Sequence, residues 1–393
     1  MSILECDPEP SRPEIYPGWS PQAVKVIFPQ LHDSSYSVRM TRRAPGLTTI
    51  LWMKIKIFCT LGPESLTPDV IEGLSRRDVD LFRINLSHTR LESVTGTIEL
   101  VQRHSDTPIC LDTEGPQVRC GMVDGEVVLM EGDHVQLTRE HVSGTAHALT
   151  LWPASVFHAL QVGALASVDF DGVILRIIEV SEGSATAVVV SSGKVRSNKA
   201  VSIDPKPDLP ALSEKDLNAI ELGTRRGIGH YALSFAGSAE DVTRLRALGP
   251  SGAHIIAKIE SRQGVQNMDE IIAAADSVLV DRGDLSREIP LEFVPYYQKA
   301  IVRRANRWNR PVYVATNLLE SMVNNRVPTI AEANDIANTL LDGVHGLVLA
   351  AETAIGRDPV GAVDMIIRAI RAFERGNDTQ LLDEDRRPAT TSV

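Results

Sequence analysis

From residue 54 onward, short apolar runs alternate with longer amphipathic segments, and this alternation restricts the chain to a few α/β folds. The amphipathic segments predict helices; one spans 359–374, and another begins after Ser213, with Asp216 completing a weak capping box. Eight strands separated by helices predict a (β/α)8 TIM barrel, while a doubly wound open sheet is the alternative, because strand counting cannot show closure. The predicted strands span residues 54–60, 80–85, 107–112, 229–235, 254–259, 277–280, 311–315 and 346–350.

One stretch, residues 118–208, departs from this rhythm and contains no predicted helix. It consists of alternating runs such as HVQLT, GVILRIIEV and TAVVVSS, separated by glycine-containing turns, which is typical of a small all-β domain. It follows the third predicted strand, where a TIM barrel has a loop on its catalytic face. We therefore predict an inserted β-barrel lid domain at 118–208, and a TIM barrel formed by 54–117 and 209–375.

The two ends of the chain differ from the barrel in composition. Residues 1–53 are predicted to form an irregular N-terminal arm, because the first 50 hold seven prolines and little periodicity, and 376–393 a polar tail. The start of the chain lacks a basic and then apolar leader, and no apolar stretch approaches the ~20 residues that span a bilayer. The sequence thus predicts a soluble, cytoplasmic protein that does not bind membranes.

Charge and cysteine usage narrow the expected partners further. The net charge of −11 argues against a general nucleic-acid binder, although a local pocket in an acidic protein can still hold a small anion. The four cysteines show no CxxC spacing, so no metal knuckle is predicted. Small molecules are therefore the expected partners.

Polar residues follow almost every predicted strand, at the end where a TIM barrel has its functional site. Six such endings on one rim are more than solubility requires, so we interpret this rim as the candidate site. The residues are Arg83, Asn85 and Ser87; Asp112, Thr113 and Arg119; Lys258 and Glu260; Asp281, Arg282 and Asp284; Thr316 and Asn317; and Glu352 and Thr353.

The segment HIIAKIES places Lys258 and Glu260 on one face of a buried strand, because alternate residues of a strand point the same way. A structural ion pair is the alternative, but buried pairs give little net stability because desolvation offsets their attraction. A site for an anionic substrate and a divalent cation gives both residues a role. Glu260 and Asp284 suit Mg²⁺, although either alone would also fit a solvated loop acid. Gly283 allows the backbone to approach a ligand closely.

The other candidates have simpler alternatives. Arg83 suits bidentate binding of phosphate or carboxylate, but a salt bridge to a neighbouring acid explains it equally well. Thr316 is either a helix N-cap, the commoner role, or a hydroxyl at the reacting centre. His88 is most simply a surface loop residue. Four oxygen-bearing residues after strands two and three suit a monovalent cation, or more simply join the two strands. These four are Asn85, Ser87, Asp112 and Thr113.

Taken together, the motifs of the chain resemble those of the pyruvate kinase family, in that family's order and over residues from about 54 to 375. The resemblance implies a TIM barrel with a mobile β-barrel lid, and phosphoryl transfer between phosphoenolpyruvate and ADP that gives pyruvate and ATP. It also implies Mg²⁺ (or Mn²⁺) and K⁺ as cofactors, and a homo-oligomer. The motifs are KIKIFCTLGPES, FRINLSH, LDTEGPQVR, LPALSEKDL, IIAKIESRQGVQNMDEI, DRGDL, ATNLLESM, PTIAEANDIANTLLDG and AETAIGRDP.

The resemblance assigns roles at the matching positions. It implies that Lys258 stabilises the transferring phosphoryl group and the enolate, and that Glu260 and Asp284 hold Mg²⁺. The backbone amides of Gly283 and Asp284, with the Thr316 hydroxyl, would hold the substrate carboxylate.

The remaining implied roles concern phosphate, nucleotide and a monovalent cation. Arg83 would bind the phosphoryl group. His88, Arg119 and Lys199 would face the nucleotide. Asn85, Ser87, Asp112 and Thr113 would form the monovalent-cation site.

Several positions depart from the family's pattern. The chain has Glu114 where the family usually has lysine, and Gln117 where it has glutamate or, in potassium-independent members, lysine. Ala350 replaces a serine whose hydroxyl belongs to the family's proton-delivery network. The family's ARGDLG is DRGDLS here, which adds Asp281 and places Ser286 where a glycine is usual. The lid motif is altered as well, and neither the family's C-terminal α/β domain nor a match to the N-terminal arm is expected in this chain.

These departures leave three hypotheses, in descending order. The first is a short pyruvate kinase-type phosphotransferase. The second applies Mg²⁺–enolpyruvate chemistry to another carboxylate or enol, as a kinase or as a carbon–carbon lyase. The third is a binding protein without catalysis, against which the retained Lys258, Glu260, Asp284 and Thr316 argue.

Overall fold

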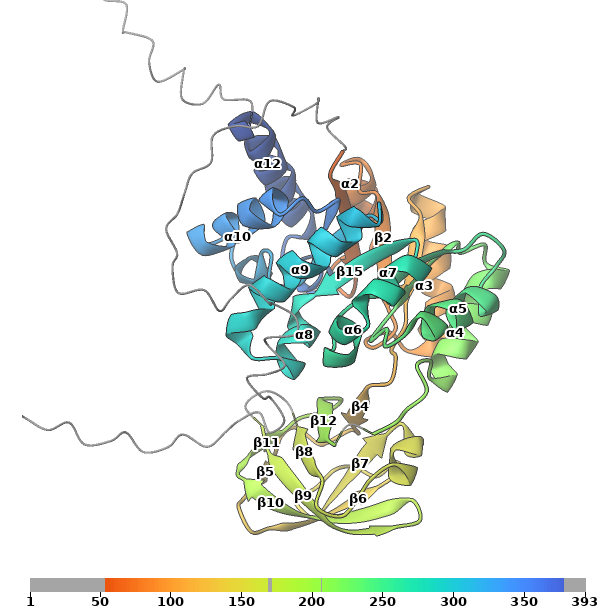
Figure 1. The fold of residues 1–393 in the computed structure, drawn as a ribbon, viewed down its shortest axis with the longest axis vertical. Helices are drawn as coiled ribbons and strands as arrows, with labels where there is room; N and C mark the ends of the chain where they lie inside the picture. The colour runs from red at the N-terminus through yellow and green to blue at the C-terminus, as the bar shows by residue number, and fades with distance from the viewer. Residues whose placement is uncertain (1–53, 169–171, 206, 378–393) are drawn as a thin grey trace, which may run out of the picture. The chain divides into compact units, whose positions relative to one another are not determined.

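The computed structural model describes residues 54–168, 172–205 and 207–377 (Figure 1). The predicted N-terminal arm lies outside these residues, as does the predicted tail from residue 378 onward. The last helix, α12 (Pro359–Asn377), runs three residues beyond its predicted end and includes the first two residues assigned to the tail. Among the described helices, none is both long enough and apolar enough to cross a membrane.

Eight parallel strands close into a barrel, in the order β1-β17-β16-β15-β14-β13-β3-β2. Closure confirms the TIM barrel and excludes the open sheet, and each strand lies within two residues of its predicted bounds. The strands are β1 (Lys56–Leu61), β2 (Leu81–Asn85), β3 (Ile109–Asp112), β13 (His230–Leu233), β14 (His254–Lys258), β15 (Ser277–Asp281), β16 (Val312–Ala315) and β17 (Gly346–Leu349).

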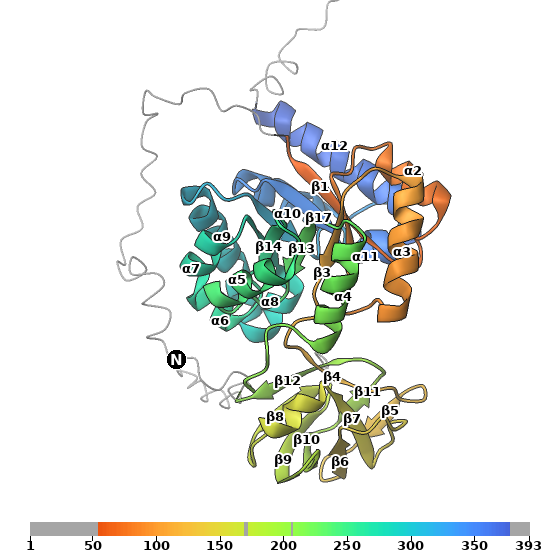
Figure 2. The ribbon, with the colours of Figure 1, turned by 90° about the vertical axis from the view of Figure 1, so that its right-hand side faces the viewer.

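Helices surround these strands, as Figure 2 shows. Helix α4 begins at a complete capping box, in which the Ser213 side chain accepts from the Asp216 backbone and Asp216 accepts from the backbone of Ser213. The helices are α2 (Pro68–Ser75), α3 (Leu91–His104), α4 (Glu214–Arg225), α5 (Ala239–Leu248), α6 (Arg262–Gln266), α7 (Met268–Ala274), α8 (Arg282–Glu288), α9 (Val294–Arg307), α10 (Ile330–Leu341), α11 (Ala351–Ala354) and α12, with short 3₁₀ turns η2 (Leu291–Phe293) and η3 (Glu320–Val323).

An apolar layer fills the interior of the barrel, so the barrel is a packed core rather than a pore. Phe58 and Tyr313 face each other across it with ring centroids 4.5 Å apart. Every strand contributes to this layer, which consists of Phe58, Leu81, Cys110, Ala232, Ile256, Leu279, Tyr313, Ala315 and Val348. It forms the floor on which the polar rim stands.

A second closed barrel is formed by strands between Val118 and Asp204, in the order β10-β6-β7-β4-β12-β8-β9. Alternate side chains of these strands are buried, as the period of two in the sequence predicted. Its strands are β4 (Val118–Cys120), β6 (His134–Thr138), β7 (Ala148–Trp152), β8 (Leu165–Val168), β9 (Ile174–Ser181), β10 (Ser184–Ser191) and β12 (Ala200–Asp204); β5 (Val127–Leu129) and β11 (Gly193–Val195) pair separately.

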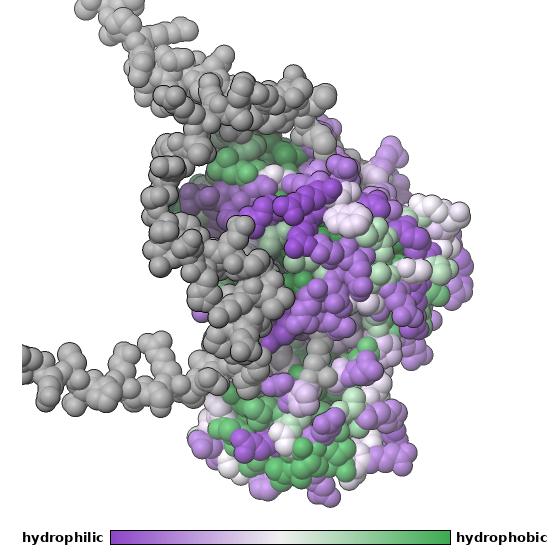
Figure 3. Space-filling view, viewed as in Figure 1, coloured by the Kyte–Doolittle hydropathy of each residue, from purple (hydrophilic) through white to green (hydrophobic). Residues whose placement is uncertain are grey.

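The second barrel has its own apolar core, which includes Leu137, Leu151 and Ile177. Its described residues include one short 3₁₀ turn, η1 (Ala154–His158), where the sequence predicted no helix. Some apolar side chains of this part are exposed, among them Val128 and Met130, and Figure 3 shows hydrophobic surface over it.

Candidate active site

A layer of polar side chains stands directly above the apolar floor of the TIM barrel. It arises because residues two apart in a strand point to the same side, so an apolar residue of the floor is followed by a polar residue of the rim. The pairs are Leu81 and Arg83 in β2, Cys110 and Asp112 in β3, Ile256 and Lys258 in β14, and Leu279 and Asp281 in β15.

Lys258 is the central cation of this rim and is only 3% exposed. Its Nζ donates to Ser234 Oγ at 3.0 Å and lies 3.1 Å from Glu260 Oε2, 3.4 Å from Asp112 Oδ2 and 3.6 Å from Asp281 Oδ2. Burial alone would lower the pKa of Lys258, but the three carboxylates outweigh burial and raise it above its usual value. The rim therefore holds a permanent positive charge in a water-poor place.

Arg83 is the second buried cation of the rim. Its Nε donates to Asp112 Oδ2 at 2.5 Å, and its other nitrogens contact Thr60 Oγ1, at 2.9 Å, and Asp112 again. Asp112 Oδ1 accepts from Ser234 Oγ at 3.1 Å. The structure thus contains the salt bridge that was one of the two interpretations of Arg83, and the bridge orients the guanidinium.

Two hydroxyl residues of this network, Thr60 and Ser234, are not among the candidates found in the sequence. Thr60 lies near the end of β1, and Ser234 directly follows β13. Both residues could have been found from the sequence by their position at the carboxyl ends of predicted strands. A single hydroxyl beside apolar residues is, however, a weak signal of a functional site.

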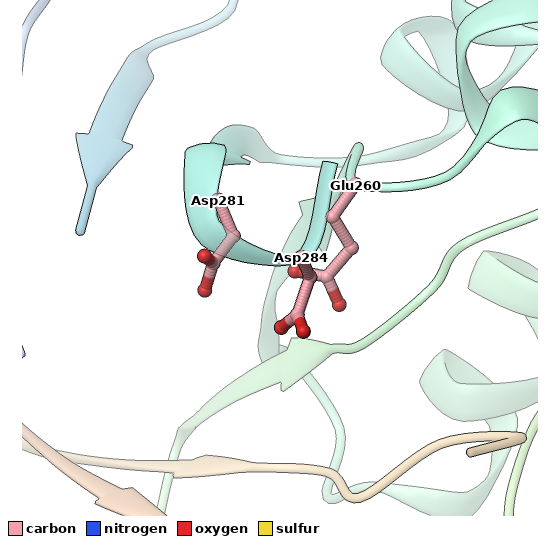
Figure 4. A group of neighbouring side chains, drawn as sticks. All are labelled: Glu260, Asp281 and Asp284. Carbon is pink, nitrogen blue, oxygen red and sulfur yellow. The ribbon is translucent and has the colours of Figure 1, made fainter. Parts of the chain in front are cut away.

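Three carboxylates lie together at the ends of β14 and β15. One oxygen each of Glu260, Asp281 and Asp284 lies within 4.8 Å of the others, and Figure 4 shows the three groups pointing to the same side. Glu260 Oε1 accepts from the Phe235 backbone at 2.9 Å, whereas Oε2 is buried without a hydrogen-bond partner, although Lys258 Nζ is near.

The electrostatics of this group favour a bound cation. Burial, together with Asp284, raises the pKa of Glu260 well above its usual value, although Lys258 opposes this shift. Burial and the neighbouring Asp281 raise the pKa of Asp284. A divalent cation would offset the electrostatic repulsion between these carboxylates. Carboxylate oxygens are also the ligands that Mg²⁺ prefers. The residues present therefore fit Mg²⁺ or Mn²⁺.

Thr316 directly follows β16 and has a φ of +68°, a strained conformation for a β-branched residue. Its Oγ1 accepts from the Gly283 backbone at 2.8 Å, and its single proton points to Asp281 Oδ1 at 3.2 Å or to Ala315 O at 2.6 Å. The next helical element, η3, has its N-cap at Leu319, so the helix-cap interpretation of Thr316 is wrong. A Cβ at Gly283 would lie 3.4 Å from this hydroxyl, so glycine keeps the space beside it open.

The four residues predicted for a monovalent cation lie at the ends of β2 and β3. Asn85 and Asp112 are neighbours in the register of these strands. Asn85 Oδ1 accepts from the Ser87 backbone at 3.0 Å, and Thr113 Oγ1 accepts from the Ser234 backbone at 2.9 Å. The first bond is local and the second joins the end of β3 to the end of β13, so neither joins β2 to β3, and both engage oxygens that a cation would use.

The three predicted nucleotide-facing residues come from two barrels. His88 is exposed after β2 of the TIM barrel. Arg119 and Lys199 lie on the second barrel, where Arg119 pairs in register with Ala200 and donates to Asn198 O at 2.8 Å. Arg119 lies in β4, and Lys199 directly precedes β12, the strand that pairs with β4, which is compatible with a shared role.

The departures from the family's pattern have visible consequences after β3. Glu114 Oε2 is buried, lacks a hydrogen-bond partner and lies 3.9 Å from Lys215 Nζ; burial raises the pKa of this carboxyl. Gln117 Oε1 is likewise buried without a hydrogen-bond partner. At the eighth strand, the Ala350 backbone donates to Glu352 Oε2 at 2.8 Å.

Fold and rim together define a class: a TIM-barrel protein with a buried lysine and a carboxylate group suited to a divalent cation at the catalytic face. A family model described as "Pyruvate kinase, barrel domain" matches residues 52–363. The chain belongs to the pyruvate kinase family.

Curated relatives agree with this assignment. The protein named pyruvate kinase from Methylorubrum extorquens is 37% identical over 329 residues, which cover 82% of this chain and 69% of the relative. The pyruvate kinase of Geobacillus stearothermophilus is 36% identical over 355 residues, covering 86% and 60%. That of Thermotoga maritima is 34% identical over 331 residues, covering 81% and 71%. The matches thus leave between 29% and 40% of each relative's length uncovered.

Proposed function

We propose that this chain is a phosphotransferase that catalyses Mg²⁺-dependent phosphoryl transfer between phosphoenolpyruvate and ADP, giving pyruvate and ATP. The observation that carries the proposal is the buried Lys258, whose Nζ lies within 3.6 Å of Asp112, Glu260 and Asp281. Phosphoryl transfer needs positioning and charge neutralisation more than covalent chemistry, and this rim supplies both.

Glu260 and Asp284 would hold the divalent cation, which would neutralise negative charge on phosphoryl and enolate oxygens when bound. The formal charges support this, because the four carboxylates of Asp112, Glu260, Asp281 and Asp284 outnumber the three cations Arg83, Lys258 and Arg287, the last of which lies 3.3 Å from Asp284 Oδ1. The remaining negative charge favours a bound cation.

Lys258 and Arg83 would bind the transferring group as pre-positioned cations. Lys258 is fixed by its contacts with Ser234 and Glu260, so no reorganisation is needed when charge develops on the enolate. Arg83 is oriented by Asp112 and Thr60, which leaves it directed at the rim. Both residues therefore stabilise negative charge without moving.

The substrate carboxylate would bind at Gly283, Asp284 and Thr316, where the Gly283 backbone N–H lies 2.8 Å from the Thr316 hydroxyl. We further propose that the second barrel acts as a lid, and that Arg119, Lys199 and His88 contact the nucleotide. Asn85, Ser87, Asp112 and Thr113 are proposed to hold K⁺.

One assay tests the proposal. Phosphoenolpyruvate, ADP and Mg²⁺ are supplied, and pyruvate formation is followed with and without a chelator. We expect turnover that stops when the metal is removed; wild-type protein that forms no pyruvate would contradict the proposal.

A second candidate function is motivated by Glu114, which is buried near the rim without a hydrogen-bond partner for Oε2. Its negative charge stands where the family has a positive one, and this would disfavour ADP. If pyruvate is not formed from phosphoenolpyruvate, but the methyl protons of added pyruvate exchange with solvent in the presence of Mg²⁺, the enolpyruvate chemistry serves another acceptor.

A further inference from the structure

Asp281 ends β15 and is only 4% exposed, and the proposed function uses only its charge. Its Oδ1 accepts from the Thr316 hydroxyl at 3.2 Å, and its Oδ2 lies 3.6 Å from Lys258 Nζ. Asp281 is therefore an internal carboxylate held by a hydroxyl and a lysine.

These donors overlap with the set proposed to hold the substrate carboxylate, which comprises the Thr316 hydroxyl and the Gly283 and Asp284 amides. A hydroxyl has one proton and donates to one acceptor at a time. The Thr316 proton that serves Asp281 is then not available to a ligand, and a second carboxylate beside Asp281 would meet like charge.

Asp281 also belongs to the carboxylate group with Glu260 and Asp284 (Figure 4). It therefore adds negative charge at the place where a divalent cation would bind. One carboxylate thus has two opposite effects: it favours a cation and it disfavours an anion.

We propose that Asp281 is a specificity-determining residue that competes with an incoming carboxylate for the Thr316 hydroxyl, and that strengthens divalent-cation binding before substrate arrives. This inference rests on the proposed function for the location of the carboxylate subsite. It predicts that an anionic ligand binds only after Asp281 gives up its hydrogen bond with Thr316.

The test measures two affinities in the intact chain, using Mn²⁺ alone and then oxalate at saturating Mg²⁺ as probes. In Asp281→Ala we expect Mn²⁺ to bind about tenfold more weakly, the lower end of what removing a residue near a metal costs. We expect oxalate to bind about tenfold more tightly, because one charge-assisted hydrogen bond and one repulsion are released.

A second variant separates charge from hydrogen bonding. Asp281→Asn removes the charge but keeps an oxygen that accepts from Thr316, so it should lose Mn²⁺ affinity like the alanine variant and gain less oxalate affinity. Glu221→Ala, which removes an exposed acid of α4, is the matched charge control and should change neither affinity.

The two affinities must move in opposite directions. Affinities that fall together, or that stay at the wild-type values, would overturn the inference, as would oxalate that binds none of the proteins. The proposed function fails separately: wild-type protein without phosphoenolpyruvate turnover, but with the opposite shifts in Asp281→Ala, would refute the reaction and keep the role of Asp281. Normal turnover with unshifted affinities would refute the role of Asp281 and keep the reaction.

Discussion

The two ends of the TIM barrel use polar side chains in opposite ways. At the carboxyl end, Lys258 and Glu260 are buried with Nζ and Oε2 3.1 Å apart, and Oε2 lacks a hydrogen bond. At the amino end, the rings of His230 and His254 lie with centroids 5.4 Å apart, and burial lowers the pKa of both. Burial thus surrounds charged groups at the carboxyl end and favours neutral histidines at the amino end.

Carboxylates of the amino end complete the hydrogen bonding of the strands. Asp80 Oδ2 accepts from the Ile57 backbone at 2.9 Å, and Asp276 Oδ2 accepts from the Ile255 backbone at 2.8 Å. Each acid stands at the start of a strand and binds the strand before it. Because these carboxylates are hydrogen-bonded while Glu260 Oε2 of the rim is not, we expect substitutions at the amino end to change stability and substitutions at the rim to change activity.

Among substitutions of residues other than Lys258, we expect the largest effect for Glu260→Gln, at the rim. The variant keeps the size of the side chain but loses a charged metal ligand, so Mg²⁺-dependent turnover should fall about a hundredfold or more. Without metal it should unfold no more easily than wild type, because it removes a buried carboxylate whose pKa is raised by burial. Kinetics and metal-free thermal unfolding check both points, and an easily unfolded variant would show that Glu260 is structural.

At the amino end, Asp276→Ala should have the reverse signature. It leaves the Ile255 backbone N–H without its partner and removes the ion pair with Arg246, whose atoms lie 2.8 Å apart. We expect a loss of about 1–3 kcal/mol in the free energy of unfolding, with kcat within about twofold of wild type. Denaturant titration and kinetics provide the measurement, and a large drop in kcat at unchanged stability would break the comparison.

Acid should destabilise the protein through the amino-end histidines. The pKa values of His230, His254 and His345 are lower in the folded protein than in the unfolded chain, where histidine titrates at about 6.5. Their contribution to the free energy of unfolding is therefore fully present above about pH 6.5 and is lost as the pH falls through their folded pKa values. His254→Gln keeps a partner for Ser277, which His254 Nε2 contacts at 2.8 Å, but does not titrate. The unfolding midpoint of this variant should therefore fall less steeply below about pH 6.5 than that of wild type, and equal slopes would contradict the assignment.

The smallest effect is expected for Ala350→Ser. The variant adds a hydroxyl beside Glu352, which already accepts from the Ala350 backbone, and so offers one more group for delivering a proton to the enolate. We expect turnover to rise by up to about tenfold if protonation limits the rate. A solvent isotope effect on kcat, compared between variant and wild type, would show whether a proton-transfer step has changed.

Much of this arrangement follows from the sequence, because the period of two within each strand decides which side chains share a face. Lys258 is predicted to stand on the rim because it lies two residues after Ile256, and the same reasoning places Asp112 after Cys110. This period does not determine the register in which neighbouring strands are aligned. The bond from Arg83 to Asp112 depends on the register in which Asn85, not Arg83, lies beside Asp112.

Register also explains what the sequence reasoning missed. Ser234 joins Lys258 to Asp112 only because β13 lies between β3 and β14 in the barrel. Asp281 was visible as a departure from the family's motif, but its hydrogen bond with Thr316 requires the pairing of β15 with β16. The conformation of Thr316 has no sequence signal, because a positive φ at a threonine is a local strain imposed by its surroundings.

The central claim is that Lys258 is the electrostatic centre of a phosphotransferase. It is tested most directly by comparing kcat for pyruvate formation from phosphoenolpyruvate, ADP and Mg²⁺ between wild type and Lys258→Met, with circular dichroism to show that both are folded. We predict that kcat falls by about a thousandfold or more in the folded variant, because a buried cation aimed at developing charge is lost. A folded Lys258→Met protein within about tenfold of the wild-type kcat would contradict the claim.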